Sequence, residues 1–380
     1  MAGKHALLSP SSAHRWLACP PSARFEEQIP QQESAYAAEG TLAHELAAIL
    51  LMREAGIIVS EEVYETRLAL VQASPLYTPE MLEHCRNYAH TVADLGGQID
   101  VERGYDLSEY LPMSYGTADA VSTRPPYVHV VDFKYGSGVR VSATANPQMM
   151  LYALGAASKA LAKGMKIETV RMTIYQPRAG GASTWEISFD ELEHWAIHEA
   201  APAARLAVAG LGDFQAGDHC RFCRARTSCR AYFARFAEVL KIRDSREMDD
   251  LERRVVLDLG PALTKWIKAV QEDAVERLSS GRAVPGFKLV QGRGRRAFTD
   301  ENLVATTLIG SGAIPAEEVY TYSLRSLTDL ERTLGRKRFT ELLGDLVTMK
   351  EAGPVLAPAD DPRPEYCADQ AIEYELADIL

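Results

Sequence analysis

The spacing of apolar and polar residues along the chain follows two periods. Apolar residues three or four positions apart are typical of amphipathic helices, and apolar residues at every second position are typical of strands. The first pattern predicts helices over residues 39–56, 79–95, 146–164 and 190–209, and further helix between about 231 and 280. The second predicts strands over residues 98–107, 114–123, 127–135, 168–177 and 183–189. This order of elements favours an α/β fold with a mixed central β-sheet flanked by helices.

Two of the predicted helices have clear start signals. Thr78 precedes Pro79, and Asn146 precedes Pro147. Threonine and asparagine side chains accept hydrogen bonds from the first turn of a helix, and proline is tolerated at its first position because that N–H has no helical partner. We therefore expect helices to begin at Pro79 and Pro147.

The pattern changes after about residue 240. The segment PGFKLVQGRGRRAFTDE (285–301) resembles a pair of strands with a basic turn, and residues 326–349 resemble two short helices. From residue 360 to the end, seven Asp or Glu stand against one Arg, which is typical of a loosely ordered acidic tail. We expect a first domain over residues 1–240, a mostly helical C-terminal region over 241–353, and an acidic tail over 354–380.

Composition limits the class of protein. The 380 residues are 47% apolar and 24% charged, enough for a sizeable core. There is no apolar run of membrane-spanning length and no apolar signal core near the N-terminus, so we expect a cytoplasmic protein. The net charge of −11 argues against a general nucleic-acid coat protein, but it leaves room for an enzyme with local basic grooves.

The segment GDHCRFCRARTSCR (217–230) places Cys220, Cys223 and Cys229 at C-x2-C-x5-C spacing. In a reducing compartment such clustering indicates metal or redox chemistry more than disulfides. Cys19, between a short apolar turn and Pro-Pro, is the best candidate for a fourth ligand, and His219 is the local rival. Four thiolates suit a [4Fe-4S] cluster or a structural zinc ion equally well, and metal-free cysteines are the third alternative.

A second group of polar residues lies on the predicted strands. Asp119 lies in GTADAV, and Asp132 and Lys134 lie in VVDFKYG. Residues i and i+2 of a strand share a face, so Asp132 and Lys134 should point into the same space while Phe133 points into the core. Two carboxylates and a backbone carbonyl suit Mg²⁺ or Mn²⁺, which can polarise a phosphodiester. Taken alone, however, the Asp132–Lys134 pair is more typical of a surface salt bridge at the end of a strand.

Three helical residues extend this pattern. His44 lies in GTLAH on the first predicted helix, and Gln148 and Tyr152 lie at i, i+4 on the helix that follows Lys134. Ordinary packing explains each of the three by itself. Their order along the chain, together with the carboxylates and cysteines, is the informative feature.

That order is G-x3-H, D, D-x-K and Q-x3-Y, with one cysteine before it and C-x2-C-x5-C after it. It resembles the RecB-like branch of the PD-(D/E)XK nucleases, and most of all the members closed by an iron–sulfur cluster, such as CRISPR-associated exonucleases and AddB-type nuclease domains. The likeness covers residues from about 10 to 235. The flanking segments, SPSSAHRWLACPPSA and RTLGRKRFTELLGDLV, resemble a family carried by phages and prophages. The chain departs from the superfamily pattern in lacking a proline before Asp119.

The resemblance implies a role for each matching residue. His44, Asp119 and Asp132 would bind the catalytic metal with help from the Phe133 carbonyl. Lys134 would be the catalytic lysine, and Gln148 and Tyr152 would position DNA or that lysine. The [4Fe-4S] cluster would be a structural staple held by four cysteines, namely Cys19, Cys220, Cys223 and Cys229. Glu39, just before the G-x3-H motif, is a candidate for the outer shell.

Two basic patches would suit contacts with the DNA backbone, which need no sequence reading. The first comprises Arg221, Arg224, Arg226, Arg230 and Arg235, and the second Lys288, Arg293, Arg295 and Arg296. A solvated basic face is the alternative for both patches, and it explains the second patch equally well. Family context also implies a phage single-strand annealing protein as partner, and an oligomer is compatible with the sequence.

Three functional hypotheses follow. The first is a metal-dependent DNA exonuclease that degrades the ends of linear DNA, for recombination or end resection. The second is a non-catalytic DNA-binding or scaffold protein on a nuclease fold, although the complete motif set argues against decay. The third is a zinc-stapled endonuclease. Strand polarity and single- or double-strand preference are left open by the sequence.

Overall fold

The computed structural model describes residues 6–29, 35–58, 60–136, 138–237 and 249–289, with 306, 307, 309, 330, 331, 334–343, 346 and 347. The chain divides into two compact units, Met1–Val290 and Gln291–Leu380. The predicted boundary near residue 240, the basic turn at 293–296 and the acidic tail from 354 lie outside the described residues, so these stay predictions. In the second unit the structure describes one helix of eight residues, α15 (Arg336–Leu343).

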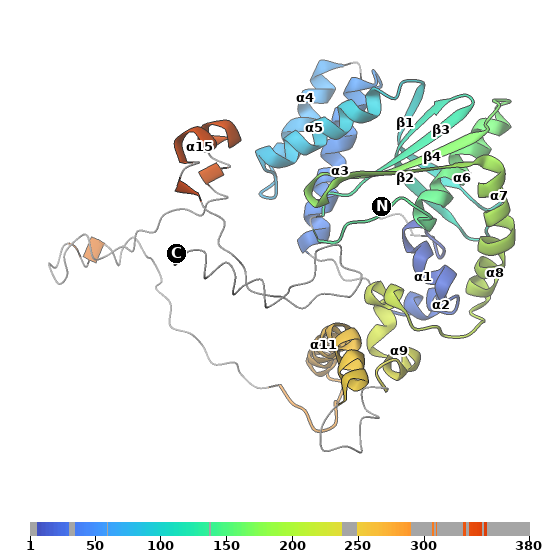
Figure 1. The fold of residues 1–380 in the computed structure, drawn as a ribbon, viewed down its shortest axis with the longest axis vertical. Helices are drawn as coiled ribbons and strands as arrows, with labels where there is room; N and C mark the ends of the chain where they lie inside the picture. Colours follow the sequence, from blue (N-terminus) through green and yellow to red (C-terminus); the bar gives the residue numbers. More distant parts are fainter. Residues whose placement is uncertain are drawn as a thin grey trace, which may run out of the picture. The chain divides into compact units, whose positions relative to one another are not determined.

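A single five-stranded sheet forms the centre of the first unit (Figure 1). The strands are β1 (Gln98–Asp106), β2 (Tyr115–Arg124), β3 (Tyr127–Phe133), β4 (Thr169–Gln176) and β5 (Gly181–Ser188), and they lie in sequence order. Neighbouring strands are antiparallel except β3 and β4, which are parallel. The predicted mixed sheet flanked by helices, and with it the α/β class, is therefore confirmed.

The parallel pair requires a crossover connection, and helix α6 (Pro147–Ala162) supplies it. Asn146 caps α6 by accepting hydrogen bonds from the backbone N–H groups of Gln148 and Met149. Thr78 caps helix α5 (Pro79–Ala93) in the same way. Both predicted helix starts are confirmed, because the capping side chain and the following proline specify the position locally.

Helices cover both faces of the sheet, and alternate residues of β3 show the division. Val131 and Phe133 lie in one apolar cluster with helix α3 (Ala35–Glu54) and α5, next to helix α4 (Glu61–Gln72). Val128 and Val130 lie in the other cluster, with α6 and helix α1 (Ala13–Ala18). Helix α2 (Ser22–Glu27) contacts α1 at this second face. Figure 1 shows α3, α4 and α5 together on one side and α6 on the other.

The helix predicted over 190–209 is interrupted. It consists of α7 (Phe189–Trp195), a π-helical turn (Ala196–Ala200) and α8 (Ala201–Ala209). Pro202 lies at the start of α8 and has no N–H to donate to the preceding turn. The wider π-helical turn accommodates that missing hydrogen bond.

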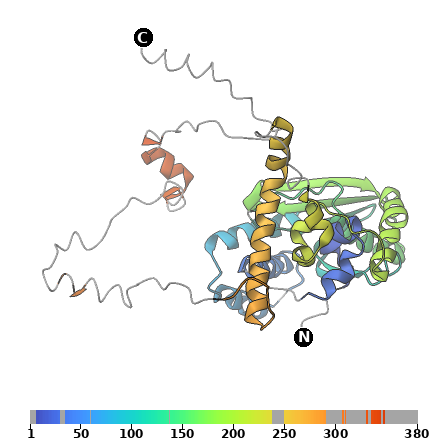
Figure 2. The same cartoon turned by 90° about the horizontal axis from the view of Figure 1, so that it is seen from below.

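The chain after α8 returns to the N-terminal helices. Two short 3-10 helices, η4 (Asp218–Phe222) and η5 (Arg224–Thr227), lead to α9 (Arg230–Ala234). The long helix α11 (Asp250–Ser279), prominent in Figure 2, contacts η5 and packs Trp266 against Phe236. In the part of the chain that the structure describes, no helix is long and apolar enough to span a membrane.

Candidate metal centre and cysteine cavity

The candidate metal centre lies where the pairing of β1 with β2 is interrupted and the pairing of β2 with β3 ends. The ladder between β1 and β2 is interrupted opposite Asp119, at Glu102. The ladder between β2 and β3 ends at Ala120 and Val131, one residue short of Asp119 and Asp132. Asp119 is thus outside the regular backbone pairing on both sides, and its side-chain carboxylate contacts the neighbouring strand instead.

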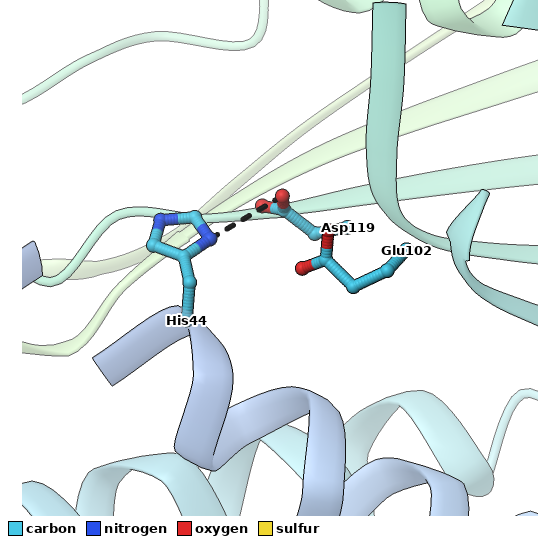
Figure 3. A group of neighbouring side chains, drawn as sticks. All are labelled: His44, Glu102 and Asp119. Atoms are coloured by element: carbon cyan, nitrogen blue, oxygen red, sulfur yellow. Dashed lines mark ion pairs between the residues drawn. The ribbon is translucent and has the colours of Figure 1, made fainter. Parts of the chain in front are cut away.

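The Asp119 carboxylate joins β2, β3 and α3. Its Oδ2 accepts a hydrogen bond of 2.7 Å from the backbone N–H of Phe133. Its Oδ1 lies 3.3 Å from Nδ1 of His44 on α3, the contact drawn in Figure 3. Figure 3 also shows Glu102 directed toward the same carboxylate. The ligand atoms of His44, Glu102 and Asp119 all lie within 4.8 Å of one another, a spacing that a single cation can bridge.

Glu102 is the member of the site that sequence reasoning missed. Its backbone has φ of 47°, in the left-handed region, which costs a non-glycine residue about 1–2 kcal/mol. Burial of its carboxylate, and then the nearby charge of Asp119, raise the pKa of Glu102 to about 7. Only the register of β1 against β2 brings Glu102 to Asp119, and register is not visible in residue spacing.

Asp132, Lys134 and Gln148 form a closed set of polar contacts beside Asp119. Asp132 is 3% exposed, at the end of β3. Lys134 Nζ lies 3.0 Å from Asp132 Oδ2, and Gln148 Nε2 donates to Asp132 Oδ1 at 3.0 Å. Lys134 Nζ also donates to Gln148 Oε1 at 3.4 Å. The i, i+2 spacing on β3 and the first turn of α6 thus bring the three side chains together.

The electrostatics of the site favour a cation. Burial raises the pKa of Asp132, and Asp119 adds to the rise while Lys134 opposes it. Burial would lower the pKa of Lys134, but Asp132 and Asp119 together keep it above its usual value. Three carboxylates therefore face one lysine and one histidine, and the surplus of negative charge is what a divalent ion would neutralise.

Tyr152 and Glu39 lie further from the carboxylates. Tyr152 is buried, its ring packs against Gly116 of β2, and its hydroxyl hydrogen-bonds the Gln148 side chain. Burial raises the pKa of Tyr152, so the hydroxyl stays protonated. Glu39 of α3 forms an ion pair with Arg178. Tyr152 can thus orient Gln148, whereas Glu39 belongs to a neighbouring contact.

The four predicted cysteines line one small cavity that is partly open to solvent. Cys19 follows α1, Cys220 lies in η4, Cys223 joins η4 to η5, and Cys229 caps α9. The structure therefore brings the N-terminal cysteine and the C-x2-C-x5-C triplet to one place.

Polar groups around the cavity also fit an anionic cluster. The hydroxyl of Ser22 is buried, lines the cavity and has no hydrogen-bond partner there. The backbone N–H of Gly217 donates to Cys220 Sγ at 3.4 Å, and Arg15 and Arg226 contribute to the lining. Thiolates and sulfides accept hydrogen bonds, so an unpartnered hydroxyl and two cations are chemically suited to this group.

Other predicted residues have more varied surroundings. Arg224 and Arg226 hydrogen-bond the backbone at Ile29 and Cys223, whereas Arg221 lies over the Phe222 ring at the surface. Cys85 is buried in the core between α5 and α3, and Cys367 lies outside the described residues. His219, the rival ligand, hydrogen-bonds Cys19, which raises the pKa of His219.

Comparison with known proteins gives a family and a distant structural likeness. A crystal structure of SSO0001 resembles the chain with 13% sequence identity and a TM-score of 0.29, covering 58% of this chain and 84% of that one. At that score the likeness does not define the fold. The model of the family described as "Protein of unknown function (DUF2800)" matches residues 5–364, nearly the whole length. The chain therefore belongs to the DUF2800 family.

Proposed function

We propose that this protein is a Mg²⁺- or Mn²⁺-dependent deoxyribonuclease that hydrolyses phosphodiester bonds at the ends of linear DNA. One observation carries the proposal: the carboxylates of Glu102, Asp119 and Asp132 meet His44 and Lys134 at a single edge of the sheet. A hard cation prefers oxygen ligands of this kind, and a cation beside a lysine can stabilise the charge that develops during phosphodiester hydrolysis. The arrangement matches what the PD-(D/E)XK resemblance implies.

Each side chain has a chemical task in this proposal. Asp119, Asp132 and His44 would hold the ion, with Glu102 and the Phe133 carbonyl as further ligands. The ion, when bound, supplies a polarised phosphodiester and a water of lowered pKa. Lys134 Nζ donates toward the phosphate and offsets the charge that develops on it. Gln148 hydrogen-bonds both Asp132 and Lys134, so it holds the two side chains in a fixed relative position.

The cysteine cavity would hold a [4Fe-4S] cluster as a structural staple, with zinc as the alternative. Cys19 would come from the N-terminal helices, and Cys220, Cys223 and Cys229 from the segment after the sheet. The two segments are in contact around this cavity, where Glu26 of α2 accepts a hydrogen bond of 2.7 Å from the backbone N–H of Arg224. The cluster would lock that junction.

The preference for DNA ends, the role in phage recombination or end resection, and a single-strand annealing partner rest on the resemblance alone. Two other functions are distinguished by experiment. A scaffold protein on the same fold would bind DNA without cutting it. A zinc-stapled endonuclease would cut DNA that has no ends.

The test is degradation of end-labelled linear duplex DNA with Mg²⁺ or Mn²⁺, with closed circular DNA in a parallel reaction. We expect loss of label from linear DNA only. Asp132→Asn should lower the rate at least ~1,000-fold, because it removes a ligand charge needed in the transition state. Asp100→Asn is the matched control, since Asp100 lies on β1 of the same sheet but pairs with Lys159.

The other outcomes are equally informative. Cleavage of the circular DNA would favour the endonuclease. If wild-type protein with its four-cysteine site loaded cuts neither substrate with either ion, the scaffold hypothesis replaces the nuclease.

A further inference from the structure

Two arginines occupy the edge of the sheet at which β3 and β4 both end. Because the two strands are parallel, their carboxyl ends lie together, and Lys134 N–H bonds Tyr175 O across them at 2.9 Å. The segment after β3 carries Arg140, and the turn after β4 carries Arg178. Both therefore come from the edge that carries Lys134.

The segment after β3 is held by one buried side chain. Gln176, 4% exposed, donates from Nε2 to the carbonyls of Gly136 and Val139 at 2.9 and 3.0 Å. Its Oε1 accepts from the N–H of Val141 at 3.1 Å. Three hydrogen bonds from a buried amide fix the backbone on both sides of Arg140. The exposed side chain of Arg140 therefore projects from a defined position.

Arg178 is positioned by two contacts. Its NH1 lies 3.0 Å from Glu39 Oε1, and its guanidinium carbon lies 4.7 Å from the centre of the Tyr135 ring. The side chain is a quarter exposed. A guanidinium has five N–H donors in a planar fork, so an ion pair through NH1 leaves donors for a second anion. A stacked, ion-paired arginine also loses little conformational entropy when it binds one.

The two arginines flank the same turn. Gly180 has φ of 98°, and Arg140 Nε lies 3.4 Å from the position that a Cβ would take there. Beside the segment after β3, a Cβ at Gly136 or Gly138 would meet no atom within 4 Å, so the backbone borders open space. The result is a cationic rim with room beside it, next to an anionic metal centre, in a protein of net charge −11.

We infer that Arg178 and Arg140 bind a backbone phosphate next to the scissile one and so set the path of the DNA strand across this edge. The inference rests on the proposed function and adds its substrate contact. The recognised group is a phosphodiester, so the contact is independent of base sequence. Glu39 and Tyr135 orient Arg178, and Gln176 orients the segment that bears Arg140.

The test uses fluorescence anisotropy with a labelled duplex of mixed sequence, in full-length protein that carries Asp132→Asn to block cleavage. Affinity is measured between about 50 and 200 mM salt, where log K falls linearly with log salt by about 0.9 per phosphate contact. Because the two arginines share one phosphate contact, substituting both with alanine should reduce the slope by about 0.9 and weaken binding roughly tenfold at low salt, and Arg178→Ala or Arg140→Ala alone should give part of that change. In protein without the blocking substitution, Arg178→Ala should raise KM with little change in kcat.

Two matched variants separate phosphate binding from a structural role. Arg171→Ala removes an arginine of β4 that pairs with Glu186 on β5, and the slope should not change. Glu39→Gln removes the negative charge beside Arg178, but its amide oxygen can still accept a hydrogen bond from Arg178 NH1, so Arg178 keeps both its orientation and its charge and the slope should be retained. If Glu39→Gln reproduces the loss, Arg178 acts through the fold and the inference is wrong. Unchanged slopes in both arginine variants, or no binding by the blocked protein, would equally overturn it.

Failure of the inference is distinct from failure of the proposed function. If wild type cleaves DNA but the arginine variants have unchanged salt slopes, the nuclease proposal stands and the proposed phosphate contact of Arg178 and Arg140 is wrong. If the arginine variants have reduced salt slopes but wild type cleaves no DNA in any condition, the two arginines bind a backbone phosphate in a protein that binds DNA without cutting it.

Discussion

At the scale of single residues, the candidate metal centre depends on side chains of two kinds. Asp132, Lys134 and Gln148 are readable from the sequence, because their separations follow the period of a strand and the first turn of a helix. Glu102 is not readable, because only tertiary register brings it to Asp119. A left-handed backbone at Glu102 is an observed strain, and strain of this kind commonly persists where a site needs a particular geometry.

The role of Glu102 is testable by Glu102→Gln. The substitution keeps the size of the side chain and removes one of the charges that faces the cation. We expect the Mn²⁺ concentration for half-maximal DNA cleavage to rise about tenfold, with a smaller change in the rate at saturating metal. Glu109→Gln, on the exposed connection between β1 and β2, is the matched control. An unchanged metal requirement would remove Glu102 from the ligand set.

At the scale of elements, the sequence predicts the strands and the capped helices well. Successive side chains of strand β3, for example, alternate between the two apolar clusters, and this period of two is readable in the sequence. Helix α4 was missed because its apolar residues are not confined to one face: Leu70 is 71% exposed although Val71 is buried. The π-helical turn before Pro202 was missed because apolar spacing is nearly the same on both sides of it.

The sheet has a pH-dependent contribution to stability at His129 on β3. Burial, and then the charge of Arg171, lower the pKa of His129 from 6.5 to about 4. As pH falls below 6.5 the unfolded chain binds a proton that the folded chain does not bind until about pH 4. The free energy of unfolding therefore decreases over this window, by an amount on the order of 1 kcal/mol after solvent screening.

His129→Gln should reduce this acid sensitivity while an amide keeps a hydrogen bond to Thr173, which His129 Nε2 contacts at 2.8 Å. The measurement is the denaturant midpoint of variant and wild type at several pH values between about 7 and 4. The pKa of His14 is also lowered to about 4, so the variant should still lose some free energy of unfolding over the same pH window because of His14. Parallel curves for the two proteins would show that His129 titrates normally.

At the scale of the whole molecule, the first unit is closed by a junction between residues 6–29 and 217–237. Arg224 NH1 donates to the carbonyl of Ile29 at 2.8 Å, and Glu26 accepts from the Arg224 backbone. The sequence predicts this closure only through its cysteines, because the other contacts each join one side chain to a backbone group and leave no residue pattern. Nothing in the spacing predicts that Arg224 and Arg226 bond the chain around the cysteines themselves.

Cys19→Ser tests whether the junction holds metal. With the cluster on four cysteines, the variant should lose bound iron and the broad visible absorption, and unfold with a free energy lower by roughly 3 kcal/mol or more. Cys85→Ala should retain iron, because Cys85 lies in the core with its Sγ 3.4 Å from the carbonyl of Ala43. Metal analysis of protein purified without oxygen decides the case: full iron in Cys19→Ser excludes Cys19, and zinc in wild type excludes the cluster.

The position of this junction along the chain has a consequence for synthesis on the ribosome. Every residue assigned to the metal centre precedes residue 153, whereas the junction needs a segment that begins at residue 217. Translation proceeds at about 5–20 residues per second, so roughly 70 further residues take about 4–14 s. During that interval the nascent chain contains every ligand of the metal centre while its N-terminal helices still await their partner. Closure of the junction therefore comes after every residue of the metal centre has been synthesised.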